Sequence, residues 1–303
     1  MRYTARTMAA GLALAAVAAV GGAADARGSG ACDRNCLSGV LDAYLTAVVR
    51  HDVSAAPLAA GYRGTENAVE VAPGQGVWKS ATGLGAVQRR YVDPVNGTAA
   101  FFGLFGEQAG PAITSLRIKV EGRMVKEAEF ILGRPGEALY SPAGLTAAPP
   151  RAGLLKKAER ATRAQLEAAA NSYFDGLEAH SGAKVLHNPG CQRLENGARV
   201  TGMVLPWTAA FAPPPELRAE YLRGDCAKLD GQTQIRAVVH RRFPVIDEEA
   251  GVVLGTAMFL RPPGSTRQRL LLSEYFETGQ GRINTIYAAM NYLSAAAPET
   301  TGW

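Results

Sequence analysis

Glu274 and Arg241 are the two residues whose types and spacing best suit chemistry. In an expected strand Glu274 alternates with Leu272 and Phe276, so its carboxyl should point to the apolar side of the sheet. Arg241 alternates with Phe243 in another expected strand and is the candidate partner. Burial raises the pKa of a carboxyl and suits it to general acid–base catalysis. We therefore predict an inward Glu274–Arg241 pair, either catalytic or a buried ion pair that only orders the core.

Residue types elsewhere in the sequence do not indicate a metal or cofactor site. The sequence contains no HExxH segment, no clustered metal ligands, no recognisable Ser-His-Asp or Cys-His arrangement and no phosphate-binding glycine motif. His51 and His180 fall at the ends of expected helices, where a cation suits the helix dipole. We expect neither a metal nor a cofactor.

The sequence repeats itself at an offset of 129 residues. Each copy contains a helix-like run, a loop, a Glu-Asn dipeptide, a short strand and a tryptophan. The identical pairs are Tyr44/Tyr173, His51/His180, Gly61/Gly190, Glu66/Glu195, Asn67/Asn196, Val71/Val200 and Trp78/Trp207. A unit of roughly 130 residues has the size of one small domain. Further along the chain the match resumes at a longer spacing, where Glu274 corresponds to Ile118, so we expect chemistry in the second copy rather than the first.

Helix and strand patterns predict an α+β fold for each copy. Apolar periodicity predicts helices over 32–51 and 154–180, and a short helical piece from Trp78 to about Arg89. The expected strands are 65–71, 98–105, 112–120 and 124–132, then 194–200, 234–243, 251–260, 269–277 and 282–290. Helices followed by an antiparallel meander are typical of α+β domains, not of an alternating nucleotide-binding sheet.

The repeated polar and aromatic residues are candidate ligand contacts. Strand alternation points Asn67 and Asn196 inward and the preceding glutamates outward, although a bulge would invert this pattern. Alternatively, the Glu-Asn dipeptide fixes a loop or the seam between the domains. The repeated tyrosines lie on apolar helix faces as proton donors or core residues, and the tryptophans are pocket-lid or core aromatics. The candidate ligand-binding set is Tyr44, Asn67, Trp78, Tyr173, Asn196 and Trp207.

Residues 1–26 predict a cleaved signal peptide. Arg2 and Arg6 precede an apolar run that ends at Val20, and Ala24-Asp25-Ala26 is a small-x-small cleavage site. The run is shorter than the ~20 residues that span a bilayer, so we expect no integral membrane segment and a periplasmic or secreted protein. The net charge of +5 is mild and the basic residues are dispersed, so we expect no nucleic-acid partner.

The four cysteines fit an oxidising compartment. Of three pairings we predict Cys32–Cys36, at the first turn of a helix, and Cys191–Cys226, which ties the start of a strand to a later loop. The CxxxC spacing of the first pair also suits a redox or metal site, but no histidine lies near it in the sequence.

The domain boundaries follow from these patterns and from the distribution of proline and glycine. They are a first α+β domain over 32–133, a Pro/Gly-rich linker over 134–153, a second α+β domain over 154–293 and a flexible tail over 294–303.

Several motifs carry a resemblance to a known superfamily. They are Cys32-x3-Cys36-Leu37, Asp42-x-Tyr44-Leu45, Arg63-x-Thr65-Glu66-Asn67, Tyr91-Val92-Asp93-Pro94, Phe101-Phe102-Gly103, Arg117-x-Lys119-Val120-Glu121 and Arg242-Phe243-Pro244-Val245-x-Asp247-Glu248-Glu249. With them the chain resembles the SnoaL-like branch of the nuclear-transport-factor-2-like superfamily, and within it secreted fungal and bacterial tandem-domain proteins. One departure is that Gly64 and Ala68 stand where those proteins tend to carry Phe and Gly.

The resemblance implies two cone-shaped barrels, each a curved antiparallel sheet wrapped around helices, with any ligand cavity inside the cone. It also implies a monomer in which the tandem copies form a pseudo-dimer. Enzymes of this superfamily are mostly cofactor-free lyases, isomerases and dehydratases. Two functions therefore remain open: a small-molecule-binding protein that performs acid–base catalysis on an apolar or aromatic molecule, and a non-catalytic ligand-binding or structural protein of the envelope.

Overall fold

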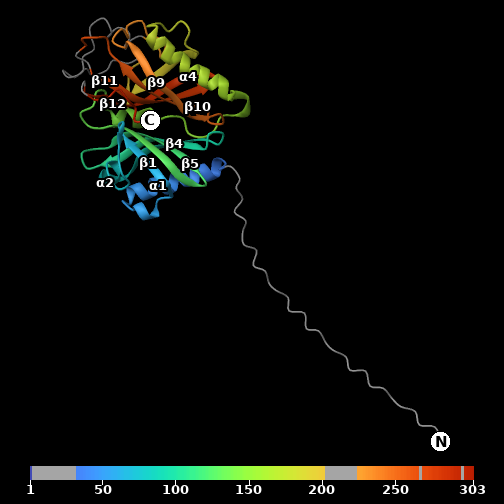
Figure 1. Cartoon of the computed structure of the whole chain (residues 1–303). Helices are drawn as coiled ribbons and strands as arrows, with labels where there is room; N and C mark the ends of the chain where they lie inside the picture. The colour runs from blue at the N-terminus through green and yellow to red at the C-terminus, as the bar shows by residue number, and fades with distance from the viewer. Residues whose placement is uncertain (2–31, 202–223, 266–267, 295–296) are drawn as a thin grey trace. The chain divides into compact units, whose positions relative to one another are not determined.

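The chain forms two six-stranded mixed sheets, each accompanied by one long helix (Figure 1). The computed structural model describes residues 32–201, 224–265, 268–294 and 297–303, together with Met1. The predicted signal peptide therefore lies outside the described residues, apart from Met1. None of the helices in the described part of the chain is long and apolar enough to cross a membrane.

The first repeat is built from nine elements. They are α1 (Arg34–Val49), η1 (Val53–Ala55), β1 (Leu58–Glu66), β2 (Val69–Glu70), α2 (Val77–Ser80), β3 (Ala81–Asp93), β4 (Thr98–Glu107), β5 (Ala112–Glu121) and β6 (Met124–Gly133). The sheet order is β2-β1-β6-β5-β4-β3. Only the β1–β6 pair is parallel among the strand pairs described for this sheet.

The second repeat has the same order of strands. After α3 (Pro142–Ala147) and η2 (Lys157–Glu159) come α4 (Arg163–Glu178), β7 (His187–Glu195), β8 (Ala198–Arg199), β9 (Ala237–Asp247), β10 (Val252–Leu260), β11 (Arg269–Gly279) and β12 (Arg282–Leu293). Its sheet order is β8-β7-β12-β11-β10-β9, again with one parallel pair, β7–β12, among those described. The predicted tandem α+β organisation is confirmed. Each sheet has two edges, so neither closes into a barrel within the described residues.

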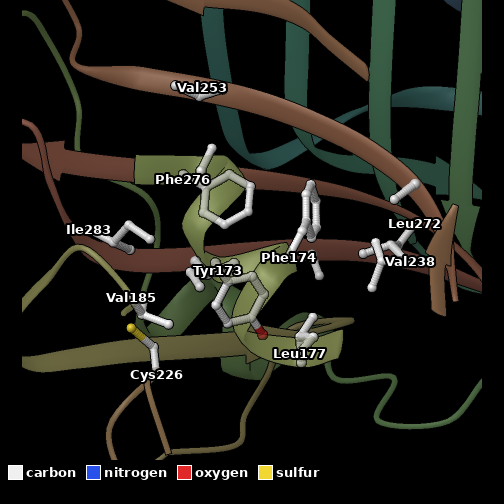
Figure 2. Close-up of a cluster of buried hydrophobic side chains, with 14 of the residues drawn as sticks. Tyr173, Phe174, Leu177, Val185, Cys226, Val238, Val253, Leu272, Phe276 and Ile283 are labelled. Carbon is white, nitrogen blue, oxygen red and sulfur yellow. The ribbon is translucent and has the colours of Figure 1, made fainter. Parts of the chain in front are cut away.

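Both faces of each sheet are buried. One face of the first sheet packs on α1, around Tyr44 and Phe101. One face of the second sheet packs on α4, and Figure 2 shows Tyr173 and Phe174 of that helix among side chains of the sheet. The remaining faces pack on each other, so the layers run helix, sheet, sheet, helix. This inter-sheet core includes Ala100, Phe102, Leu104, Ile131, Leu254, Leu271, Tyr275 and Ala289.

The helix starts are set by local capping. The Asp33 side chain accepts a hydrogen bond from the Cys36 backbone N–H at 2.9 Å and begins α1. Thr162 and Gln165 form a capping box that begins α4. The second helix is therefore shorter than the predicted 154–180, because this box fixes its first turn at Arg163.

Residues 81–93 form the long strand β3, and the predicted helix from Trp78 to about Arg89 is wrong beyond α2. The β3–β4 register shifts twice, between Ala81 and Gly83 and between Leu84 and Gln88. These irregularities break the two-residue alternation by which a strand is recognised in a sequence.

Two reciprocal Arg–Asp pairs connect the repeats. Arg163, at the start of α4, donates two hydrogen bonds to Asp93 of the first repeat, at 2.9 and 2.8 Å. Arg34, at the start of α1, pairs with Asp247 of the second repeat. The two arginines are 129 positions apart, so the repeated sequence places the same contact twice across the seam. Both aspartate side chains are fully buried.

The segments outside the two predicted domains are not plain connections. Residues 134–153 contain the helix α3, whose Leu145 is buried in the inter-sheet core. The predicted flexible tail ends in residues packed on the first sheet: Thr301 is buried, and the indole N–H of Trp303 donates to Thr65 Oγ1 at 2.8 Å.

Candidate functional site

Glu274 lies inside the second repeat, on the sheet face that packs against α4. On β11 it stands between Gly255 of β10 and Ala288 of β12. Its residue exposure is 2%, and its Oε2 atom has no hydrogen-bond partner among the described residues. The inward direction agrees with strand alternation in the sequence.

Arg241 is not the partner of Glu274, and this part of the prediction is wrong. Its guanidinium binds α4 instead, with Asp175 Oδ1 at 2.5 Å and Glu178 Oε2 at 2.6 Å. It also lies over the ring of Phe174, 5.7 Å from the centroid. The reason is its place on the edge strand β9, where the register with β10 shifts. From this edge, the acidic residues on the outer side of α4 are the nearest charges.

The charged neighbours of Glu274 come from β7. Arg193 and Glu195 form an ion pair with N and O 2.9 Å apart, and Arg193 Nη1 donates to the Tyr173 hydroxyl at 3.0 Å. The charges of Arg193 and Glu195 both shift the pKa of Glu274, and the negative charge of Glu274 in turn raises the pKa of Tyr173. We call these four residues (Tyr173, Arg193, Glu195 and Glu274) the Glu274 cluster.

Burial dominates the electrostatics of the cluster. Loss of hydration is the largest cause that raises the pKa of Glu274, the negative charge of Glu195 adds to it, and Arg193 opposes both, with a net pKa of about 8. Burial also raises the pKa of Tyr173 far above its ordinary value. At neutral pH Glu274 is therefore mostly a neutral acid, able to donate one hydrogen bond and still close enough to its pKa to ionise.

The same place in the first repeat is filled by apolar side chains. Across the second sheet the row reads Gly255, Glu274, Ala288 and Glu195. Across the first sheet the equivalent row reads Phe101, Leu116, Phe130 and Glu66. The sheet register thus pairs Glu274 with Leu116 and corrects the predicted match with Ile118. Two phenylalanines and a leucine replace a glycine, an alanine and a carboxylic acid.

Tyr44 and Glu66, the first-repeat equivalents of Tyr173 and Glu195, are bonded to nearby side chains or to the backbone. Glu66 pairs with Arg134 at 2.7 Å and accepts from the Val77 backbone N–H at 2.6 Å. The hydroxyls of Tyr44 and Tyr62 are 2.8 Å apart. Trp78 packs edge-on against Tyr44, with ring centroids 5.4 Å apart, so both predicted ligand residues are core residues.

A comparison with known protein families matches most of the chain. The model of the domain of unknown function DUF8021 matches residues 31–131 and 159–290. The chain belongs to the DUF8021 family. Among curated proteins no match was found.

Asn67 and Asn196 form the turns that close the first hairpin of each DUF8021 repeat, so their predicted inward direction is wrong. Both adopt positive φ angles, 48° and 42°. Each amide binds the backbone of the neighbouring strand: Leu132 N–H donates to Asn67 at 2.8 Å, and Met290 N–H donates to Asn196 at 2.8 Å. Alternation fails here because the strand ends at the preceding glutamate, which therefore lies on the helix face.

We predict that Asn196→Ala lowers the free energy of unfolding by about 1–3 kcal/mol, because it leaves the buried backbone groups of Met290 without partners. Denaturant unfolding measures the change. Asn196→Gly keeps the positive φ accessible and isolates the loss of the amide. A variant with unchanged stability that lost only ligand affinity would contradict this assignment.

Arg193 is the member of the cluster that the sequence analysis missed. It occupies the same strand face as Cys191 and Glu195, and its exposure is 4%. Cys191 belongs to the core on the helix face of the sheet. A predicted buried disulfide at Cys191 would therefore have indicated that Arg193, two residues further along the strand, faces the helix as well. Both predicted disulfides, Cys32–Cys36 and Cys191–Cys226, are confirmed. Trp207 lies outside the described residues. Among the residues that the structure describes, no group of three or more metal-binding side chains occurs.

Proposed function

We propose that the second DUF8021 repeat binds a small apolar or aromatic molecule and that Glu274 exchanges a proton with it. The observation that carries the proposal is a buried carboxyl whose Oε2 atom lacks a partner among the described residues. A buried polar atom without a partner costs stability, so its presence calls for an explanation such as a ligand or a catalytic role. Its replacement by Leu116 in the first repeat shows that the fold itself does not require it.

The chemistry of the cluster suits a proton transfer next to a carbonyl group. Neutral Glu274 donates a hydrogen bond to a carbonyl oxygen, and ionised Glu274 removes a proton from the adjacent carbon. The electron pair then moves onto the carbonyl oxygen, whose negative charge the guanidinium of Arg193 stabilises. Return of the proton to another carbon gives an isomerase, and loss of a leaving group gives a lyase or dehydratase. Neither reaction needs a cofactor.

The surroundings of Glu274 favour an apolar ligand. Leu272 and Phe276 flank it on β11, and both belong to the core under α4. Figure 2 shows Phe276 next to Tyr173 and Phe174 of the helix, and Leu272 next to Val238. A ligand without a polar group would leave the carboxyl unsatisfied, so we propose an apolar or aromatic skeleton that carries one oxygen.

We propose that each sheet curves around its helix as in the SnoaL-like cones, and that the chain is a monomer in which the first repeat is the partner of the second. The inter-sheet core supports a monomer, because the face of each sheet that points away from its helix is already covered by the other sheet of the same chain. Both disulfides fit a location outside the cytoplasm, and we propose secretion or export to the periplasm.

A non-catalytic binding protein of the envelope is the second candidate. It is favoured by the bonds within the cluster, because Arg193 is already engaged by Glu195 and Tyr173. The same cluster would then hold a ligand through Glu274 without a proton transfer.

Hydrogen–deuterium exchange of aromatic ketones distinguishes the two candidates. A panel of methyl aryl ketones is incubated with the protein in D2O, and loss of the α-proton signal is followed by NMR. We expect wild-type protein to accelerate exchange and Glu274→Gln to abolish the acceleration, with Glu277→Gln as a control because Glu277 is a buried glutamate on the opposite sheet face. Ketones that bind wild type but not Glu274→Leu, without exchange, favour the binding protein; equal exchange in wild type and Glu274→Gln contradicts the catalytic role.

A further inference from the structure

The segments that follow β6 and β12 reach equivalent places on opposite repeats. We call residues 138–145 the first arm and residues 297–303 the second arm. Gly144 of the first arm lies against the carbonyl of Gly197, so that an added Cβ would be 2.4 Å from its oxygen. Gly302 of the second arm lies in the same way against the carbonyl of Ala68, where the corresponding distance is 2.9 Å.

The spacing of these contacts follows the repeat. Ala68 and Gly197 are 129 positions apart, as are the hairpins that contain them. Gly144 and Gly302 are 158 positions apart. Val125 of β6 and Ile283 of β12 have the same spacing. These two residues are equivalent, because they pair with Leu58 and His187, which are themselves 129 positions apart. The arms are therefore the last part of each repeat, beyond the region that the family model matches.

Each arm places an apolar side chain directly after its glycine. Leu145 of the first arm is fully buried in the core between the sheets. In the second arm this position is Trp303, and the first sheet surrounds it with polar groups. The guanidinium carbons of Arg63 and Arg117 each lie 4.3 Å from the centroid of its ring.

The place that holds Trp303 is itself well ordered by the fold. Thr65, 1% exposed, accepts the indole N–H at 2.8 Å, and Arg63 donates to the carbonyl of Gly302. Arg117 is 5% exposed and is fixed by Glu127 at 2.5 Å and Glu129 at 2.9 Å. Two stacked guanidiniums and one hydroxyl acceptor specify an indole over an aliphatic side chain.

We propose that Arg63, Thr65 and Arg117 form a docking site for a peptide segment with the sequence Gly-Trp, and that the chain's own second arm is its occupant. The docked arm is a strap that covers the edge hairpin β1–β2 of the first repeat and connects it to the end of β12. Because the ring contacts involve only these few side chains, the arm should also bind as a separate peptide once the chain's own residues 297–303 are replaced. This proposal does not depend on the chemistry at Glu274.

The test uses two full-length variants, Trp303→Ala and a chain whose residues 297–303 are replaced by a Gly-Ser sequence, together with a synthetic peptide of residues 297–303. We expect Trp303→Ala to lower Tm by about 2–4 °C and the arm replacement by at least as much, and the peptide in excess to restore the loss in the arm-replaced chain while leaving wild type unchanged. A peptide with alanine in place of its tryptophan serves as the matched control and should restore nothing. Thr65→Val, which removes only the indole acceptor, should lower Tm in the same direction by less.

Three results would overturn the proposal. The first is a Trp303→Ala chain with the same Tm as wild type. The second is a peptide that fails to raise the Tm of the arm-replaced chain. The third is a peptide that raises the Tm of wild type and of the arm-replaced chain equally, since this would indicate binding elsewhere.

Discussion

Asp247→Asn is expected to lower the free energy of unfolding by about 3 kcal/mol, the lower end of the range for a broken buried pair, because it neutralises a fully buried carboxylate and leaves the partly exposed Arg34 with Glu249 as its counter-charge. The carboxylate of Asp247 also accepts the backbone N–H groups of Val92 and Ala250, each at 2.9 Å. One side chain thus joins the first helix, the end of β3 and the end of β9. Guanidinium unfolding measures the change.

Asp93→Asn is the matching substitution in the other repeat, and it should cost about as much. Asp93 holds Arg163 with two hydrogen bonds and accepts the Ile246 backbone N–H at 3.0 Å. Because Asp93 binds the backbone next to Asp247, and Asp247 binds the backbone next to Asp93, the double variant should lose less than the sum of the singles.

The control for both is Asp42→Asn, which removes an exposed ion pair with Arg90. It should cost about 0–1 kcal/mol. If Asp247→Asn behaved like this control, the two reciprocal pairs would not be what holds the repeats together.

Glu274→Gln is expected to stabilise the protein at alkaline pH and to leave it unchanged at low pH. Folding raises the pKa of Glu274 from an ordinary 4.5 to about 8, so the folded state keeps a proton that the unfolded state loses. Wild type therefore loses stability as the pH rises from about 4.5 to about 8, and the loss is complete above that range. Each pH unit in this interval is worth about 1.4 kcal/mol, which sums to a few kcal/mol.

Glutamine mimics the protonated acid and cannot ionise, so the variant lacks this slope. Unfolding free energies of the two proteins should coincide near pH 4 and diverge towards pH 9. Glu167→Gln on the exposed side of α4 is the control and should follow wild type at every pH. Parallel curves for wild type and Glu274→Gln would mean that Glu274 ionises normally in the folded state.

Much of the fold could be predicted from local sequence patterns. The tandem organisation followed from the paired residues of the two copies, and the disulfides followed from the compartment and the cysteine spacing. Glu274 was placed inward because it stands two residues from both Leu272 and Phe276 on β11, where the backbone keeps the two-residue alternation of sheet faces.

The errors arose where the backbone leaves that period. Alternation ends at Asn67 and Asn196, which adopt positive φ, so the adjacent glutamates lie on the opposite face from the one predicted. The edge strands β3 and β9 contain register shifts. Those in β3 break the alternation by which a strand is recognised in a sequence, and those in β9 leave Arg241 at the edge of the sheet. These features depend on contacts between residues far apart in the sequence, as does the docking of Trp303 on Thr65.

The division of labour between the repeats is the main consequence of these findings. The first repeat has the same sheet and helix as the second but fills its interior row with Phe101, Leu116 and Phe130. The face of the first sheet that points away from α1 packs on the second repeat. The second repeat keeps a carboxylic acid, an arginine and a tyrosine in its core. Duplication allows this because one copy can supply stability while the other carries groups that cost stability.

The most direct test is the ionisation of Glu274 itself. The side-chain carboxyl carbon of Glu274 is assigned by comparing ¹³C spectra of wild type and Glu274→Gln, and its chemical shift is followed from pH 4 to pH 10. We expect a single titration with a midpoint near pH 8, moved further by a bound aromatic ketone. A midpoint in the ordinary range of an exposed glutamate would contradict the buried acid–base role on which the proposed function rests.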